Sequence, residues 1–107
     1  MIKNLGTNKV HIVVLTWNNK NLLKRCLESI ENINYTANIY DYSNFTINVI
    51  DNNSSDNSIE MIYKEFPKVN VTRNSKNLKF GAGYNSGLNK MNFDDNDFIV
   101  LLNDDTI

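Results

Sequence analysis

The chain has 107 residues, of which 41% are hydrophobic and 21% charged, and its formal net charge is -1. This length and composition suit one soluble globular domain. The charge argues against a nucleic-acid binder that works by broad phosphate neutralisation. The single cysteine, Cys26, excludes an internal disulfide and fits a reducing compartment. The apolar stretch near the N-terminus is too short for a membrane span, so we expect a cytoplasmic protein, which could work at the inner face of the membrane.

The first half of the chain predicts a strand, a helix, a loop and a second strand. Residues 10–16 form a β-branched apolar run, which is typical of a strand buried on both faces. Asn18 or Asn19 can then cap a helix whose apolar residues recur at helical spacing. Residues 34–44 are polar and aromatic without a clear period, which predicts a loop, and residues 45–51 predict the second strand.

The second half continues the alternation of helices and strands. Asn57 and Glu60 have the spacing of a capping box at the start of a second helix, and Pro67 ends that helix. The elements that follow are a brief strand, a glycine-rich helical stretch and a fourth buried strand, over residues 69–73, 80–91 and 97–103. This alternation predicts an α/β fold with a mainly parallel sheet flanked by helices.

Polar residues follow three of the predicted strands. In parallel α/β sheets, ligands bind beyond the carboxyl ends of the strands, so these residues should meet at one edge. Each cluster alone is equally well explained by a turn or a helix cap, but three clusters at one edge predict a ligand site. The three clusters are Thr16-Trp17-Asn18, Asp51-Asn52-Asn53 and Asn103-Asp104-Asp105.

The glycine-rich stretch is a second indication of a site. Gly81, Gly83 and Gly87 lie inside a predicted helix, where each glycine costs about 1 kcal/mol relative to alanine. Close approach of a ligand, or of a strand to the helix, would offset that cost. The spacing fits neither a phosphate-binding P-loop nor a dinucleotide fingerprint.

Asp104 and Asp105 form a candidate cation site at the end of the last strand. Adjacent acids in this position can also be a solvated turn. However, Mg²⁺ and Mn²⁺ prefer oxygen ligands, and Mg²⁺ commonly uses only one or two protein carboxylates together with substrate phosphates. A short acidic motif is sufficient for that kind of site.

Four stretches of the sequence, in order, resemble the N-terminal half of a family 2 glycosyltransferase with the GT-A fold. They are VLTWNNKNLLKRCLESI, VIDNNSSDNS, NLKFGAGYNSGLN and VLLNDDT, and the resemblance runs from Val10 to Thr106. It implies a UDP- or dTDP-sugar donor, a divalent metal (Mg²⁺ or Mn²⁺), an acceptor glycan or lipid-linked glycan, transfer with inversion, and a place in cell-wall or polysaccharide synthesis. We therefore expect residues 1–107 to be the donor-binding piece of a longer enzyme, truncated after its metal motif, with the catalytic base downstream.

The resemblance also implies roles for individual residues at the nucleoside end of the donor. Thr16, Asn18 and Asn53 would border the nucleotide. Asp51 matches the acid that accepts a hydrogen bond from the imide N–H of the base, and Asn85 matches an amide on the donor side.

At the metal end, Asn103-Asp104-Asp105 occupies the place of the family's DxD motif. Asp105 would ligate the metal, while Asn103 or Asp104 would face the ribose. Asn103 replaces the first acid of the strict motif, so metal affinity would rest mainly on Asp105. Lys79 stands where many relatives have glycine, and it could reach the base or the diphosphate, or point to water.

Two alternatives from other classes stay open. One is a non-catalytic nucleotide-binding module, and the other is a small α/β interaction domain or signalling receiver. We interpret His11 as structural and Cys26 as part of the core, whereas Trp17 could stack near the base or simply pack. Self-association to a homo-oligomer through an unpaired sheet edge is a further expectation.

Overall fold

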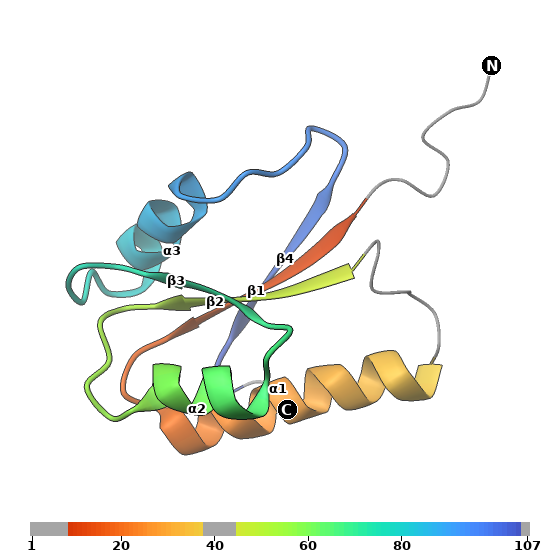
Figure 1. Ribbon diagram of the computed structural model, residues 1–107. Helices are drawn as coiled ribbons and strands as arrows, with labels where there is room; N and C mark the ends of the chain where they lie inside the picture. Colours follow the sequence, from red (N-terminus) through yellow and green to blue (C-terminus); the bar gives the residue numbers. More distant parts are fainter. Residues whose placement is uncertain (1–8, 38–44, 106–107) are drawn as a thin grey trace.

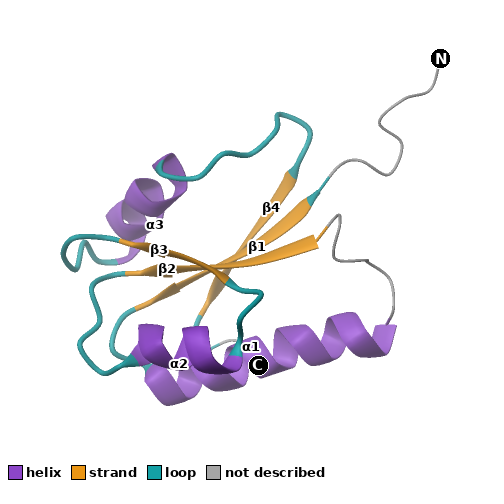
Figure 2. Cartoon of the chain, viewed as in Figure 1, coloured by secondary structure: helices purple, strands orange, loops and turns teal. Residues whose placement is uncertain are grey.

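The computed structural model describes residues 9–37 and 45–105, and these form the predicted α/β fold (Figure 1; Figure 2). Strands and helices alternate along the described chain. The elements are β1 (Val10–Thr16), α1 (Lys20–Ala37), β2 (Phe45–Asp51), α2 (Ser58–Glu65), β3 (Asn70–Arg73), α3 (Phe80–Asn89) and β4 (Phe98–Asn103). No described helix is both long and apolar enough to cross a membrane.

The four described strands form one parallel sheet in the order β3-β2-β1-β4. In the register of the sheet, Thr16 pairs with Asp51, and Asp51 pairs with Arg73. On the other side of β1, Leu15 pairs with Asn103. The carboxyl ends of all four strands therefore meet at one edge, as the parallel topology requires.

Successive side chains of the central strands point to opposite faces of the sheet, so both faces carry apolar side chains. Helices cover both of these faces. Val14 and Val49 point to the face that α1 and α2 cover, where they pack with buried residues such as Leu27. Val13 and Ile50 point to the opposite face, where α3 lies (Figure 1). The Tyr84 hydroxyl, on α3, also donates a hydrogen bond to the Leu102 carbonyl of β4.

The prediction that β4 is buried was wrong. Residues 98–101 are exposed, from 41% at Val100 to 62% at Phe98, whereas Leu102 is partly buried. The reason is its place in the sheet, since β4 is the outer strand and β1 is its only partner among the described residues. The apolar sequence of β4 would suit a buried central strand, and only the strand order shows that β4 lies at the edge of the sheet.

Helix α1 runs to Ala37, so the first four residues of the predicted loop over residues 34–44 are helical. Residues 38–44 lie outside the described part of the chain. The predicted capping box of α2 is not formed. Asn57 occupies the N-cap position in a left-handed conformation, with φ of 66°, and its side chain makes no capping hydrogen bond.

A single aspartate provides the capping instead. The Asp56 carboxylate accepts hydrogen bonds from the Ser58 backbone N–H at 3.1 Å and from the Lys20 backbone N–H at 3.0 Å. It thus serves the first residues of both α2 and α1. Partial burial raises the pKa of Asp56, but the hydrogen bonds from Ser58 and Lys20 outweigh it and hold the pKa below its ordinary value.

Candidate functional site

A cavity of about 510 Å³ lies at the carboxyl edge of the sheet. Its wall includes Thr16 and Trp17 after β1, Asn103, Asp104 and Asp105 at the end of β4, and Lys79 before α3. Three segments that are far apart in the sequence therefore contribute to one cavity. The edge that the sequence predicted as a ligand site is the edge that contains this cavity.

The other predicted residues lie beside the cavity wall. Asn53 lines a second hollow of about 300 Å³, which it shares with Arg73 and Glu60. Asn18, in the turn after β1, and Asp51, the last residue of β2, line neither hollow. Asn85 is exposed on α3 and lines neither hollow.

Asp51 is fully buried at the end of β2, with 0% of its surface exposed. Its Oδ2 atom accepts a hydrogen bond from the Ser54 backbone N–H at 2.9 Å and lies 3.5 Å from Nε of Arg73. Its Oδ1 atom is buried and has no partner among the described residues. An unpaired buried acceptor costs about 1–3 kcal/mol, which makes this oxygen the clearest anomaly of the site.

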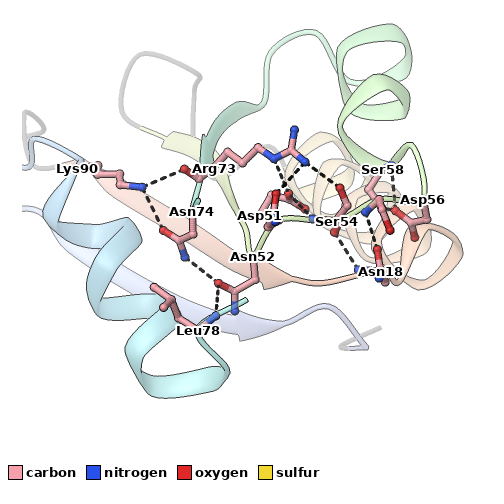
Figure 3. Close-up of polar contacts among 12 residues, drawn as sticks. Asn18, Asp51, Asn52, Ser54, Asp56, Ser58, Arg73, Asn74, Leu78 and Lys90 are labelled. Carbon is pink, nitrogen blue, oxygen red and sulfur yellow. Dashed lines mark hydrogen bonds and ion pairs between the residues drawn. The ribbon is translucent and has the colours of Figure 1, made fainter. Parts of the chain in front are cut away.

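Asn18 and Asn53 shape the turns around Asp51, and Figure 3 shows Asn18 next to Ser54. The Asn18 backbone N–H donates to Oγ of Ser54 at 2.8 Å, and Oδ1 of Asn18 accepts from the Ser55 backbone N–H at 2.7 Å. Oδ1 of Asn53 accepts from Nη2 of Arg73 at 3.1 Å. Both asparagines have positive φ, 48° and 70°, which asparagine tolerates better than most residues. Of the two residues predicted to cap α1, Asn18 therefore makes a contact between turns, whereas Asn19 directly precedes the helix and its carbonyl accepts from the Leu23 backbone N–H at 2.8 Å.

The acidic side of the cavity contains two carboxylates in different surroundings. Oδ2 of Asp104 accepts a hydrogen bond from Oγ1 of Thr16 at 3.0 Å, which joins the ends of β4 and β1. Asp105 is exposed and makes no hydrogen bond or ion pair with the described residues. Within those residues there is also no cluster of three or more His, Cys, Asp or Glu side chains that could hold a metal by itself.

Cys26 lies in the core behind the acidic motif, as predicted, and is only 1% exposed. Its Sγ atom lies 3.9 Å from the carbonyl oxygen of Asn103. Burial, together with the nearby charges of Asp104 and Asp105, raises the pKa of the Cys26 thiol to about 11. The thiol is therefore protonated at neutral pH and is not a nucleophile for this site.

Two buried asparagines connect β2, β3 and α3 (Figure 3). Sequence reasoning named Asn52 in one of the three polar clusters without giving it a role of its own, and it missed Asn74. Asn52 is 2% exposed and Asn74 is 0% exposed. Nδ2 of Asn74 donates to Oδ1 of Asn52 at 2.9 Å and to the Gly83 carbonyl at 3.1 Å. One signal was available, because Asn74 directly follows the third strand and thus belongs to the same polar edge.

Lys79 has an unusual backbone conformation, with φ of 66° and ψ of -162°. This region is essentially restricted to glycine, and a residue with a side chain stores of the order of 1–3 kcal/mol there. Lys79 lies in the cavity wall just before the first turn of α3. A glycine, which the resemblance leads us to expect at this position, would adopt this conformation without that strain.

The family model for glycosyl transferase family 2 matches residues 11–107. The chain belongs to this family. No curated protein sequence matches it, so the relatives that can be compared are solved structures. The glycosyltransferase chain is similar in fold to Staphylococcus aureus TarS, with a TM-score of 0.72 and 20% identity over 91% of this chain and 16% of TarS.

A second similar structure is the mannosyltransferase PcManGT from Pyrobaculum calidifontis, solved with GDP-Man and Mn²⁺. The TM-score is 0.71 and the identity 17%, over 94% of this chain and 29% of the mannosyltransferase. TarS residues 1–349 have also been solved with UDP and with UDP-GlcNAc. The family 2 glycosyltransferase chain thus spans less than a third of either protein, and at these identities the likeness establishes the GT-A fold.

Proposed function

We propose that this chain is the donor-binding part of an inverting glycosyltransferase, and that its cavity binds a UDP- or dTDP-sugar. The acceptor would be a glycan or a lipid-linked glycan in cell-wall or polysaccharide synthesis. Family membership and the GT-A fold support the reaction class. The location of the cavity, where three strand ends meet, supports donor binding at this edge.

The observation that carries the proposal is the unpaired Oδ1 of Asp51. Uracil and thymine present a ring N–H that an ionised carboxylate accepts well. Such a hydrogen bond would satisfy the buried oxygen and would distinguish these bases from cytosine, whose ring nitrogen is an acceptor. Asp51 is fully covered, so a base must displace a neighbour to reach it. The half-exposed side chain of Arg73, next to Asp51, is the group that would move.

The residues present fit a divalent cation at the acidic end of the cavity. Asp105 is exposed and uncommitted among the described residues, and the carboxylate of Asp104 retains free acceptor capacity beside its bond from Thr16. A bound Mg²⁺ or Mn²⁺ would neutralise negative charge on the diphosphate leaving group. Because no cluster of three such ligands exists in the described chain, diphosphate oxygens and water must complete the coordination. Asn103 or Asp104 would face the ribose.

Calorimetric titration of the 107-residue chain tests the proposal. UDP and dTDP should bind in the presence of Mn²⁺, and CDP should bind more weakly. Asp51→Asn should weaken UDP binding about tenfold, the scale of one charge-assisted hydrogen bond, and should reduce the preference over CDP. Asp105→Ala should abolish the dependence on Mn²⁺.

Asp95→Asn is the matched control, because it removes one exposed carboxylate in the loop that precedes β4, outside both hollows. Its nucleotide affinity should equal that of the unaltered chain. Equal binding of UDP and CDP by the unaltered chain would remove the role of Asp51. Nucleotide binding that ignores Mn²⁺ would instead favour a non-catalytic nucleotide-binding module.

A further inference from the structure

We propose that the buried pair Asn52 and Asn74 is a positioning device, which holds Lys79 in its glycine-like backbone conformation and so fixes this lysine in the wall of the donor cavity. Asn52 lines the cavity as well, but among the described residues the side-chain hydrogen bonds of the pair go to the segment before α3 and to α3 itself, and not to Asp104 or Asp105. The pair acts through the segment between β3 and α3, which contains Lys79. The role of Lys79 in donor binding rests on the proposed function, whereas its conformational restraint does not.

The restraint is visible in the hydrogen bonds around Lys79. Nδ2 of Asn52 donates to the Lys79 carbonyl at 2.9 Å, and Oδ1 of Asn52 accepts from the Leu78 backbone N–H at 3.3 Å. The same carbonyl of Lys79 accepts from the Gly83 backbone N–H at 3.1 Å. Asn52 therefore binds the carbonyl of the strained residue and the backbone N–H of the residue before it. The Lys79 backbone N–H itself donates to Oδ1 of Asn77 at 2.9 Å.

Asn74 fixes Asn52 in turn. It donates to Oδ1 of Asn52 and to the Gly83 carbonyl, and its own Oδ1 lies 3.3 Å from Nζ of Lys90. Each amide group of the pair is engaged, and both side chains are almost completely buried. A buried polar network in which every group is satisfied is rigid, because any rearrangement would leave a donor or acceptor unpaired.

Gly83 makes room for this arrangement. A Cβ atom at Gly83 would lie 2.6 Å from Nδ2 of Asn52 and 3.1 Å from its Oδ1. The glycine therefore lets the amide of Asn52 reach the beginning of α3. Strained conformations persist only where the surroundings over-determine them, and the contacts of Asn52, Asn74 and Gly83 supply that condition for Lys79.

The functional consequence is a restrained lysine in the same cavity as the acidic motif. Lys79, Asp104 and Asp105 all line the cavity, so a diphosphate bound there would have both a lysine and the proposed metal site within the same cavity. A lysine held by its backbone loses less conformational freedom on binding than one in a mobile loop. We therefore expect the amide pair to affect affinity for the diphosphate through Lys79.

A double-mutant cycle with Lys79→Gly and Asn74→Ala tests the restraint. Lys79→Gly should raise the urea midpoint of the unaltered chain by roughly 0.5–1 M, since the strain is relieved. The same substitution should give no gain in the Asn74→Ala background, where the segment has already relaxed. An equal gain in both backgrounds would overturn the proposal. If Asn74→Ala does not fold, Lys90→Met, at the exposed end of the network, replaces it, and an unchanged gain again overturns the proposal.

UDP affinity gives the second readout. Asn74→Ala should weaken UDP binding about tenfold when Lys79 is present and should have no effect in the Lys79→Gly chain. A purely structural asparagine would weaken binding equally in both. Lys76→Gly is the matched control, because it removes the same charge three residues earlier, outside the cavity wall, and should not raise the urea midpoint. If the unaltered chain does not bind UDP, the proposed function fails, and the urea cycle still decides the restraint.

Discussion

Replacing Gly87 with alanine should destabilise the chain, although alanine is the better helix former. A Cβ atom at Gly87, in α3, would lie 2.5–2.6 Å from three carbon atoms of the Ile50 side chain. Ile50 is fully buried in β2 and packs against α3. Ordinary contacts between carbon atoms are about 3.5–4.0 Å, so the helix and the sheet must separate by roughly 1 Å.

The size of the effect follows from two opposing contributions. Overpacking of a well-packed core costs about 1–3 kcal/mol, and a clash with three atoms of a branched side chain belongs to the upper part of that range. Alanine in place of glycine inside a helix returns about 1 kcal/mol. We therefore expect a net loss of about 2 kcal/mol in the free energy of unfolding.

Urea unfolding followed by circular dichroism measures this loss, with Gly81→Ala as the matched control. Gly81 lies in the same helix, and a Cβ atom there would meet nothing within 4 Å. Gly81→Ala should therefore stabilise the chain by up to about 1 kcal/mol, the opposite sign. Ile50→Ala should lessen the cost of Gly87→Ala in the double variant. A Gly87→Ala chain as stable as the unaltered one would refute the close approach of α3 and β2.

Three further predictions concern stability and reactivity. Asp56→Ala should cost about 2 kcal/mol in urea unfolding because it uncaps both α1 and α2, whereas Glu60→Ala should stay within about 0.5 kcal/mol. The hydrogen bond from His11, 2.7 Å from Asp97, holds the pKa of Asp97 below its ordinary value. The contribution of Asp97 to stability is therefore full above the unfolded pKa of about 3.9 and is lost as the pH falls through the folded pKa. The urea midpoints of the unaltered and Asp97→Asn chains should converge on acidification, and a constant difference between them would contradict this. The Cys26 thiol, whose pKa is raised to about 11, should resist alkylation at pH 8 until urea unfolds the chain, and rapid labelling of the native chain would contradict its burial.

Packing within the chain explains two of the three glycines of α3, but not Gly81. The sequence predicted that close approach offsets the cost of the glycines, and this is confirmed for Gly83, which approaches Asn52, and for Gly87, which approaches Ile50. Gly81 approaches no other described residue. Approach of a ligand to Gly81 stays a prediction, in keeping with its place next to the cavity residue Phe80.

The sequence was sufficient to place the polar edge because parallel topology is a simple rule. Once the strands were known, Thr16, Asp51 and Asn103 had to come to the same edge, and their register confirms this. His11 was also placed correctly, at the opposite edge, where Nδ1 lies 2.6 Å from Oγ1 of Thr46 and where Asp97 binds the other ring nitrogen. These interpretations depend only on the period of the strands and on the direction of the chain.

The sequence alone therefore determined the alternation of elements, the edge of the sheet where the site lies and the family, since each of these is written in local periodicity and short motifs. The tertiary structure decided which residues cap a helix, which residues restrain a backbone segment, and which strand is exposed to solvent. Asp56 reaches Lys20 across 36 residues, and Asn74 reaches Asn52 across 22. Hydrogen bonds of this kind exist only after the sheet has brought distant turns together, so no local pattern can specify them.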